Sequence, residues 1–403
     1  MKIVHIGGTY VGAQKKIEHS IHNYCRTKGH ESTILYAIGN TDDEQIICYE
    51  KKISNLIRRA LRKINKNPHS SFLGTVCVIH YLEKLRPDIV NLHILHHGYI
   101  DYILLLSYLA KRRTPVVFTA HDMWFFTGGC YYYTNIKCEG FQQGCKKCPK
   151  GTKEVDCSSR KTEKYLKKKL YLYSKLSSVS FVSVSPWVYS EMVKSEIGKY
   201  PQYMIMNAVG DTKYMPCNVR KSEKFTIIGV AANWDKRKGI DRFLELAVEL
   251  NDICNIVLVG NILDEQKNEA PSNVSFVGPV TDMYKLYELY ASSDLHVSMS
   301  LEETFGLTFV EAAIAGIKSM GFNSTAIPTV LEKTKGWVIY SCTVSEMSSQ
   351  IKELVEHREL CTLTQKEQAE IVDFFSTEKM ATDYLRVYEE TYNRMYSEED
   401  AVN

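Results

Sequence analysis

The sequence predicts an α/β protein of two domains, each a parallel sheet covered by helices. Three observations lead to this prediction. Short runs rich in β-branched residues alternate with helical patterns almost from end to end. The strand candidates are near-continuous apolar runs, which is typical of strands buried on both faces. The length of 403 residues exceeds what one ordinary core holds, so about two domains are expected.

The predicted strands form two similar sets. The first set is Lys2–Ile6, Ser32–Tyr36, Ile89–His93, Val116–Ala120 and Phe181–Val184, and the second is Phe225–Val230, Ile256–Val259, Val274–Val277, Leu295–Ser298 and Ile317–Gly321. We place a first domain at 1–185, a second domain at 186–375 and a C-terminal helix at 376–403. The apolar stripe of that helix, spaced mostly four apart, should pack back on the first domain. It consists of Met380, Tyr384, Tyr388, Tyr392 and Met395.

Composition excludes several classes of protein. The formal charge of +3 is too small to indicate nucleic-acid binding. No apolar run approaches the ~18 residues that cross a membrane. The N-terminus enters a glycine turn directly after the first predicted strand, so we expect no signal peptide. We therefore expect a cytoplasmic protein whose twelve cysteines stay reduced.

The glycine turn from Gly7 to Gly12 follows a predicted strand and precedes a predicted helix. Backbone amides at such a turn can hold a phosphate. Its spacing is not the G-x-G-x-x-G of dinucleotide-binding proteins, and the second strand ends without an acidic residue for a ribose. A turn that merely requires glycine is an equally good interpretation.

Two glutamates, Glu303 and Glu311, flank a Phe-Gly-Leu turn that leads from a predicted strand into an amphipathic helix. The first carboxylate should lie in the loop and the second in the first turns of the helix. Carboxylates pair well with vicinal hydroxyls, and the helix N-terminus favours a phosphate between them. The alternative is a solvated pair of glutamates at a helix start.

The segment Glu-x7-Glu, with Phe-Gly after the first glutamate and Glu-Ala-x-x-x-Gly at its end, resembles the signature of retaining GT-B glycosyltransferases of family 4. The resemblance implies two Rossmann-like domains facing across a cleft. It also implies transfer of a hexosyl group from a UDP- or GDP-sugar, with retention and with no cofactor required for catalysis. Glu303 would then be catalytic. Phe305, Gly306, Leu307 and Glu311 would bind the donor.

The loop from Ala231 to Gly239 matches the same family, whose Lys-Gly pair supplies a cation to the donor diphosphate. Lys238 inherits that role by resemblance, because its charge would stabilise the leaving diphosphate. Many members have an arginine where this chain has Ala232, and Arg237 is a candidate to compensate. Phe276 lies where the family stacks the nucleotide base. Gly12 would join the donor site from the first domain.

His121 and Asp122 end the strand Val116–Ala120, at the sheet edge where open α/β sheets bind ligands. By resemblance His121 lines the reacting centre, and both residues lie on the acceptor side. A purely structural His-Asp pair is an equally good interpretation. Tyr131 belongs to a run of tyrosines suited to stacking on sugar rings and completes the predicted acceptor side.

Four cysteines lie within nineteen residues of an expected cysteine-rich insertion at 124–158, in the pattern C-x7-C-x6-C-x2-C. The segment beginning at Thr119 resembles a branch of the family that works on cell-surface polysaccharides. Only the final C-x2-C has zinc-knuckle spacing. A structural zinc, disulfide pairing and four unligated thiols all remain open. The cysteines are Cys130, Cys138, Cys145 and Cys148.

The segment from Lys51 to Lys66 carries seven cations and no acids, with apolar residues along one helical face. That pattern is typical of a surface that touches anionic lipid at the inner face of a membrane, although an ordinary helix packed on the core has a similar pattern. The expected partners are a nucleotide sugar, a glycan or lipid-linked glycan acceptor and such a membrane, with no nucleic acid. The alternatives in function are a nucleotide-sugar 2-epimerase of the same fold and a non-catalytic nucleotide-sugar-binding protein.

Overall fold

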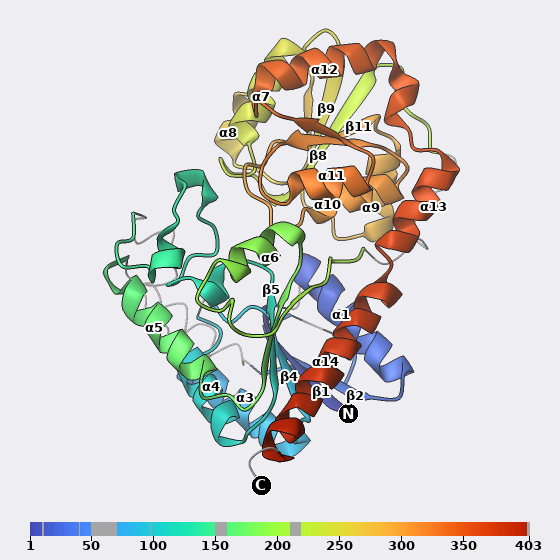
Figure 1. Ribbon diagram of the computed structural model, residues 1–403. Coiled ribbons are helices and arrows are strands. Elements are labelled where there is room, and N and C mark those ends of the chain that lie inside the picture. The colour runs from blue at the N-terminus through green and yellow to red at the C-terminus, as the bar shows by residue number, and fades with distance from the viewer. Residues whose placement is uncertain are drawn as a thin grey trace. The chain divides into compact units, whose positions relative to one another are not determined.

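The computed structural model describes residues 1–9, 12–39, 41–49, 71–96, 98–149, 159–209 and 219–400. The chain divides into two compact units, one made of residues 1–207 and 377–403 and the other of residues 208–376 (Figure 1). The predicted basic helix at 51–66 lies outside the described residues. In the part of the chain that is described, no helix is long and apolar enough to cross a membrane.

The first unit is built on a parallel sheet with the strand order β3-β2-β1-β4-β5-β6-β7 in its described residues. Its strands are β1 (Lys2–Thr9), β2 (Glu31–Ile38), β3 (Ile46–Cys48), β4 (Ile89–Leu92), β5 (Val116–Ala120), β6 (Val179–Ser183) and β7 (Gln202–Met204). The strand order reverses between β1 and β4. Ligands of open α/β sheets bind at such a switch point, beyond the carboxyl ends of the strands.

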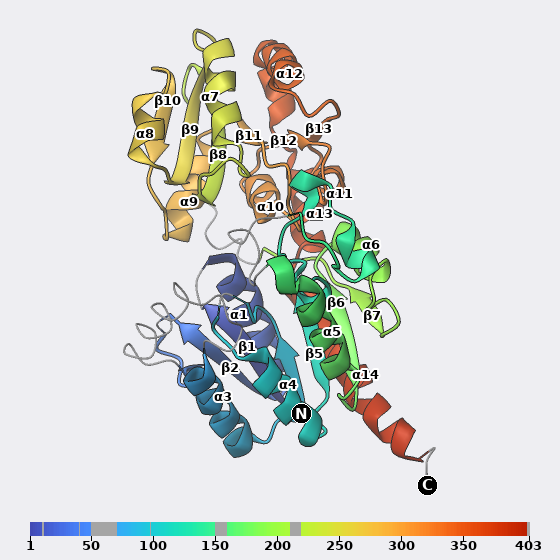
Figure 2. The same cartoon turned by 90° about the vertical axis from the view of Figure 1, so that its left-hand side faces the viewer.

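Helices cover both faces of this sheet (Figures 1 and 2). On one face α1 (Gly12–Thr27) packs against α14 (Thr377–Asp400). The other face carries α3 (Phe72–Leu85), α4 (Tyr102–Lys111) and α5 (Thr162–Tyr173), of which α4 contacts both neighbours. Asp101 caps α4, because its carboxylate accepts from the amides of Ile103 and Leu104. The crossover between β6 and β7 is α6 (Pro186–Val193), which Ser185 caps.

The C-terminal helix α14 returns to the first unit, as its aromatic stripe predicts. Tyr384 and Tyr388 are fully buried, and Met380 is nearly so. The Tyr388 hydroxyl accepts from the side-chain amide of Asn91 in β4, at 2.6 Å. The helix α14 therefore contributes to the core of the first unit.

The second unit contains a parallel sheet whose described strands follow the order β10-β9-β8-β11-β12-β13. They are β8 (Phe225–Asn233), β9 (Cys254–Asn261), β10 (Val274–Val277), β11 (Leu295–Ser298), β12 (Ser319–Phe322) and β13 (Trp337–Ile339). The order reverses between β8 and β11, so the loops that follow these two strands meet at the switch point of this sheet.

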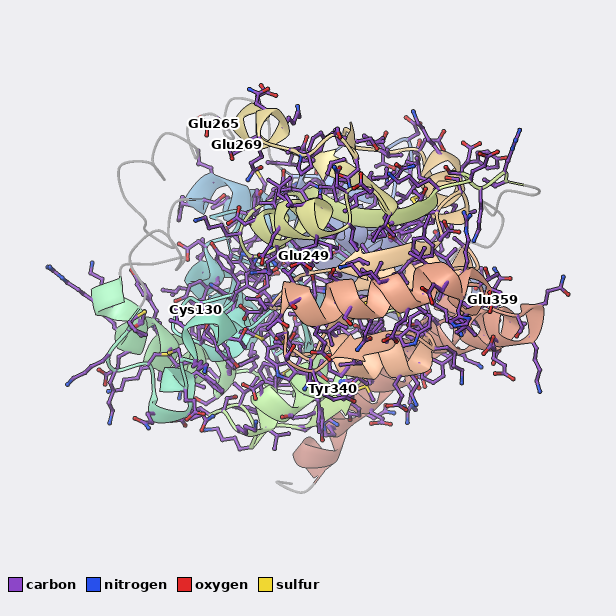
Figure 3. The ribbon with its side chains drawn as sticks, turned by 90° about the horizontal axis from the view of Figure 1, so that it is seen from above. Cys130, Glu249, Glu265, Glu269, Tyr340 and Glu359 are labelled. Atoms are coloured by element: carbon purple, nitrogen blue, oxygen red, sulfur yellow. The ribbon has the colours of Figure 1, made fainter. Side chains whose placement is uncertain are left out.

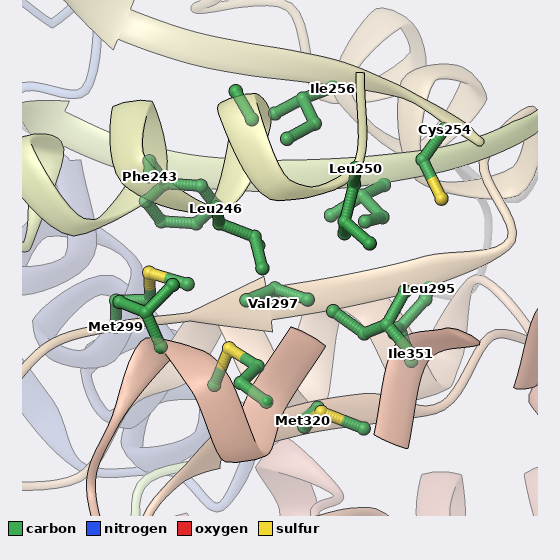
Figure 4. Packing of buried hydrophobic residues seen from close by; sticks show 14 of the residues in the cluster. Phe243, Leu246, Leu250, Cys254, Ile256, Leu295, Val297, Met299, Met320 and Ile351 are labelled. Atoms are coloured by element: carbon green, nitrogen blue, oxygen red, sulfur yellow. The ribbon is translucent and has the colours of Figure 1, made fainter. Parts of the chain in front are cut away.

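The helices of the second unit pack on both faces of the sheet, and each face has an apolar core. They are α7 (Ile240–Glu249), α8 (Asp264–Asn268), α9 (Met283–Ala291), α10 (Leu307–Ile314), α11 (Ile327–Lys333), α12 (Val344–Glu356) and α13 (Gln365–Phe374). On one face Phe243 and Leu246 of α7 and Ile351 of α12 join Val297 of β11 in an apolar cluster (Figure 4). On the other, Tyr290 of α9 and Ala312 of α10 pack with Ile228 of β8.

The α/β class, the two parallel sheets and all ten predicted strands are confirmed. One predicted boundary is wrong, because the first unit continues to Asn207 and does not end at 185. The reason is that β7 pairs in parallel with β6, so β7 and the crossover helix α6 before it both belong to the first unit. Three short strands, β3, β7 and β13, were not predicted, and each lies at an edge of its sheet.

Candidate functional site

The switch point of the second sheet brings together two of the predicted catalytic residues. Lys238 lies in the loop after β8, and Glu303 lies in the loop after the neighbouring strand β11. The Lys238 ammonium contacts Oε1 of Glu303 in an ion pair that leaves about a quarter of the lysine side chain and less of the glutamate exposed. A partly buried pair is less screened by water and salt than a surface pair.

The backbone holds Lys238 in place. Oδ1 of Asp235 accepts the Lys238 amide at 2.8 Å. Arg242 donates to the carbonyls of Lys236 and Met299 at 3.2 and 2.8 Å, which joins this loop to the one after β11. Gly239 has a φ of +84°, and a Cβ there would lie 2.6 Å from the Met299 carbonyl oxygen. Geometry therefore requires the glycine of the Lys-Gly pair.

Glu303 is fixed through its backbone, which leaves its carboxylate for the lysine. Its amide donates to the Thr325 hydroxyl at 2.9 Å, and its carbonyl accepts from the Ala326 amide at 3.3 Å. Thr325 could not be predicted from the sequence, because it contacts Glu303 only when β12 brings its loop beside that of β11. Glu303 thus lies in the loop, as expected.

The helix α10 begins at Leu307, directly after Gly306, which has a φ of +91°. The first amides of a helix have no partner within it and favour an anion. Phe305 is buried against Phe375, with ring centroids 6.0 Å apart, so its side chain belongs to the core and only its backbone can meet a ligand.

Glu311 lies in the second turn of α10 and is only 5% exposed. The Tyr290 hydroxyl donates to its Oε2 at 3.3 Å. Burial, and then the Glu311 charge, raise the pKa of Tyr290, so this phenol keeps its proton. One carboxylate oxygen of Glu311 therefore has an internal donor that orients the group.

One predicted donor-site residue, Phe276, lies apart from this ion pair, whereas Arg237 lies in the same loop as Lys238. Phe276 is on the edge strand β10, which β9 and β8 separate from β11, and its ring packs partly against the core. Arg237 is half-buried, and its carbonyl accepts from the Leu301 amide at 3.4 Å. Ala232, where the family pattern has arginine, is exposed.

In the first unit the predicted glycine turn is only partly described. Gly12 begins α1, while Tyr10 and Val11 before it lie outside the described residues. Gly8 is needed for close packing, because a Cβ there would lie 2.4 Å from the ring of Tyr99. This contact accounts for one glycine of the turn without a ligand.

His121 follows β5 and is half-buried. Its Nε2 lies 2.9 Å from Nδ1 of His93, which follows β4. Burial lowers the pKa of His121 to about 4, against the opposing charge of Asp122, so the ring is neutral near pH 7. His93 was predicted only as the last residue of a strand, and the structure brings it into direct contact with His121.

Asp122 connects the loop after β4 with the segment after β5. Its Oδ2 contacts Nε2 of His96 at 2.6 Å, and its Oδ1 accepts the Trp124 amide at 2.9 Å. The ring of His96 lies nearly parallel to that of Tyr131, with centroids 5.2 Å apart. Asp122 thereby holds a half-exposed aromatic surface that includes Tyr131.

A buried lysine of α5 holds the cysteine-rich segment between β5 and α5 in place. Figure 3 labels Cys130 of this segment. Lys169 of α5 donates to the carbonyls of Trp124 and Thr127 at 2.5 and 3.0 Å. Its ammonium lies 3.4 Å from the centroid of the Trp124 ring, a cation–π contact. Lys169 lies three residues after Leu166 and four before Tyr173, and this spacing places it on the apolar face of α5, unlike the neighbouring solvent-facing lysines.

Cys145 and Cys138 receive backbone hydrogen bonds. The Gly128 amide donates to Sγ of Cys145 at 3.2 Å, and the Gly140 amide donates to Sγ of Cys138 at 3.4 Å. Burial raises the pKa of the Cys145 thiol. Across the described ranges, no three His, Cys, Asp or Glu side chains are gathered as a metal ion requires. Zinc binding by this segment stays a prediction.

Comparison with known families matches both units. Residues 19–194 match the family described as Glycosyltransferase Family 4, and residues 216–370 match Glycosyl transferases group 1. The second match contains Lys238, Glu303 and Glu311, and the first contains His121.

Known proteins resemble the chain over nearly its whole length. The putative colanic acid biosynthesis glycosyl transferase WcaC of Escherichia coli is 20% identical over 395 residues, which cover 92% of this chain and 94% of WcaC. Among solved structures, sucrose-phosphate synthase of Thermosynechococcus elongatus has a TM-score of 0.67 at 13% identity, covering 98% of this chain and 99% of that one. HepE of Anabaena, solved with UDP-glucose, has a TM-score of 0.64 at 13% identity, covering 97% and 100%.

Proposed function

Since the chain belongs to the group 1 and family 4 glycosyltransferases of GT-B fold, we propose that it transfers a hexosyl group, with retention at the anomeric carbon, from a UDP- or GDP-sugar to a glycan or lipid-linked glycan. The observation that carries the proposal is the meeting of Lys238 and Glu303 at the switch point of the second sheet. Polysaccharide biosynthesis is the setting that the resemblance to WcaC supports.

On the donor side each charged group has a separate task. Lys238 stabilises the negative charge that grows on the diphosphate as the glycosidic bond breaks. Glu303 accepts hydrogen bonds from hydroxyls of the transferred sugar and stabilises positive charge at the anomeric carbon. Glu311, oriented by Tyr290, holds the ribose. Because Lys238 and Glu303 already contact one another, donor binding exchanges this ion pair for contacts with the diphosphate and the sugar.

The first amides of α10 supply a further attraction for the diphosphate. The helix N-terminus adds a partial positive charge close to Glu303, and Gly306 lets the backbone approach a ligand. A diphosphate here is held by an ammonium and by oriented amides. We assign no step to a divalent cation.

We assign the acceptor side to residues of the first unit. His121 offers a neutral imidazole, and Tyr131 offers a ring face on which a sugar can stack. We also propose that the basic segment at 51–66 contacts anionic lipid, which would bring the enzyme to a lipid-linked acceptor at the inner face of a membrane. The complex of HepE with UDP-glucose supports UDP ahead of GDP.

Thermal-shift measurements with a panel of UDP-, GDP- and ADP-sugars test this proposal. A ligand at 100 times its Kd stabilises the folded state by about 2.7 kcal/mol, so the matching nucleotide should raise the Tm clearly. Lys238→Ala should abolish the shift for the nucleotide sugar. The matched control Lys236→Ala, which alters an exposed lysine in the same loop, should keep it. If no nucleotide or nucleotide sugar shifts the Tm, the proposed donor site is wrong.

A further inference from the structure

Three histidines from separate segments form one line through the first unit. His5 lies inside β1, His93 follows β4 and His121 follows β5. Nδ1 of His5 lies 3.3 Å from Nε2 of His93, and Nδ1 of His93 lies 2.9 Å from Nε2 of His121. His5 and His93 are essentially inaccessible to solvent. The line therefore runs from the interior of the sheet to its carboxyl edge.

The rings meet edge to edge. The ring planes of His5 and His93 differ by 28°, with centroids 5.6 Å apart. Those of His93 and His121 differ by 19°, with centroids 5.2 Å apart. Rings that are nearly parallel and whose closest atoms are ring nitrogens lie close to one plane, so each N–H points at the next nitrogen. Such alignment is what a strong hydrogen bond requires.

Proton counting leaves two possible directions for these hydrogen bonds. A neutral imidazole has one donor and one acceptor nitrogen, so three neutral rings have three protons, of which the two N···N contacts use one each. The third proton must lie at one end, either on Nε2 of His5 or on Nδ1 of His121. Nε2 of His5 is buried and has no hydrogen-bond partner among the residues that the structure describes. A proton there would leave a buried N–H donor unsatisfied, and proteins contain unsatisfied N–H donors less often than unsatisfied acceptors.

Glu18 favours the same direction. Its Oε1, from the buried side of α1, lies 3.8 Å from Nδ1 of His93. A carboxylate attracts a proton to the nitrogen that it faces. The proton between His93 and His121 then belongs to His93, and Nε2 of His121 is an acceptor. The remaining nitrogen of His121, Nδ1, must carry the proton of that ring.

The surroundings keep the line neutral and rigid. Burial lowers the pKa of His5 to about 3, and it lowers that of His93 far below the ordinary value. Asn91 of β4 donates to the Tyr388 hydroxyl and accepts from the Thr119 hydroxyl at 2.9 Å. The titratable groups around the line are Glu18 and His22 of α1, His96 after β4, Asp122 after β5, and Tyr384 and Tyr388 of α14.

We propose that His5 and His93 are positioning residues that hold His121 as the neutral tautomer with its proton on Nδ1, so that His121 donates a hydrogen bond to a hydroxyl oxygen of the bound sugar. The inference rests on the proposed function only for the identity of that oxygen. A neutral donor recognises a hydroxyl without competing with Lys238 for the diphosphate. The orientation of the imidazole is set before substrate arrives, which avoids reorganisation during the reaction.

Substitutions at His93 separate positioning from packing. His93→Leu removes both ring nitrogens and leaves Nε2 of His121 without its donor. His93→Asn keeps an amide near the position of Nδ1, where it can still donate to His121. We expect His93→Leu to lower kcat by on the order of 10-fold with little change in the KM of the donor, since misorientation of a reacting group costs rate. His93→Asn should recover most of the loss.

The direct test is nitrogen NMR of the whole chain labelled with ¹⁵N-histidine, without any substrate. Two-bond couplings identify which ring nitrogen carries the proton, and His121→Ala identifies the signals of His121. The expected result at pH 7 is a neutral His121 protonated on Nδ1, which becomes a mixture of tautomers in His93→Leu and returns to Nδ1–H in His93→Asn. His121 protonated on Nε2 in the unsubstituted protein, or a tautomer that His93→Leu does not change, would overturn the proposal.

The NMR result is independent of turnover. If His121 has the expected tautomer but no nucleotide sugar is used, the proposed function fails while the positioning by His93 stands. If transfer occurs and His121 has the other tautomer, the positioning fails alone. Unchanged circular dichroism of the His93 variants checks that they fold, and His80→Gln, at an exposed position on α3, serves as the labelled control with one histidine fewer.

Discussion

Lys238 and Glu303, which are 65 residues apart in the sequence, form an ion pair at the switch point of the second sheet. Each residue is predicted to bind a different part of the donor, so in the protein without ligand each satisfies the charge of the other. The pair therefore keeps both side chains extended toward the same point. A donor that binds must replace the contact between Lys238 and Glu303 with two contacts, one from the lysine to the diphosphate and one from the glutamate to the sugar.

This ion pair predicts a coupling free energy between Lys238 and Glu303 that a bound nucleoside diphosphate reduces. In a double-mutant cycle with Lys238→Met and Glu303→Gln, we expect a coupling free energy of about 1 kcal/mol in urea unfolding of the protein without ligand. Saturating nucleoside diphosphate should reduce it, because the diphosphate takes over the lysine. The exposed pair of Lys267 and Asp264 is the control, with a coupling expected below ~0.5 kcal/mol. Equal coupling with and without nucleotide would contradict the exchange.

Buried histidines predict a loss of stability in mild acid. Burial lowers the pKa of His5 to about 3 and that of His121 to about 4, whereas both titrate near 6.5 when unfolded. Between these values the unfolded chain binds more protons, so stability is lost as pH falls from 6.5 toward 4. Each group contributes at most about 1.4 kcal/mol per pH unit.

The measurement is the Tm as a function of pH from 7.5 to 4.5. His5→Leu should flatten the dependence by removing one of these groups, even if it lowers the Tm at pH 7. His80→Gln, at an exposed position, should leave the slope unchanged. A slope that is the same in His5→Leu as in the unsubstituted protein would show that His5 takes no part.

The cysteine-rich segment predicts a metal content. If Cys130, Cys138, Cys145 and Cys148 bind zinc, the purified protein should contain about one zinc per chain, with sulfur ligands near 2.3 Å in X-ray absorption. Amides that donate to Cys138 and Cys145 would act as the outer hydrogen bonds that such ligands usually have. Cys148→Ser should lower the zinc content, and Cys77→Ser, on α3, should not. Four titratable thiols in metal-free protein would end this prediction.

The basic segment predicts salt-sensitive binding to membranes. Vesicles with anionic lipid should bind the protein, and binding should weaken as salt rises, because each cation near such a surface contributes about 1 kcal/mol. Replacing Arg58, Arg59, Arg62 and Lys63 by alanine should reduce the binding constant by at least 10-fold. Substituting the same number of lysines in α5 and at its N-cap (Lys161, Lys164, Lys167 and Lys168) is the control. Equal binding of both variants would assign the contact elsewhere.

The sequence predicted most of the fold, because buried parallel strands are continuous apolar runs and helices between them have their own period. It missed β3, β7 and β13, which are three-residue edge strands. An edge strand this short has too few residues to show a pattern, and it exists because a longer neighbour offers hydrogen bonds. Missing β7 also placed the domain boundary 22 residues too early, at 185 and not at 207.

In the candidate site, the residues that belong to sequence motifs were predicted. The contacts between residues that are distant in the sequence were not. The spacing of Glu303 and Glu311 and the Lys238-Gly239 pair could be read directly. The contacts of Glu303 with Thr325 and of His121 with His93 depend on strands that are neighbours in space and distant in sequence. One local signal was available, since His5 is a polar residue between the apolar Val4 and Ile6 of a buried strand.

The most direct test of the central claim is the rate of nucleoside diphosphate release from the matching nucleotide sugar with its acceptor, measured for the unsubstituted protein, Glu303→Gln and Glu311→Gln. An interaction that strengthens in the transition state changes kcat, and one that is equal in both states changes KM. We predict that Glu303→Gln lowers kcat by on the order of 10²-fold, and that Glu311→Gln mainly raises the KM of the donor. Near-normal kcat and KM in both variants would contradict the account, because the two carboxylates would then have no part in binding or transferring the sugar.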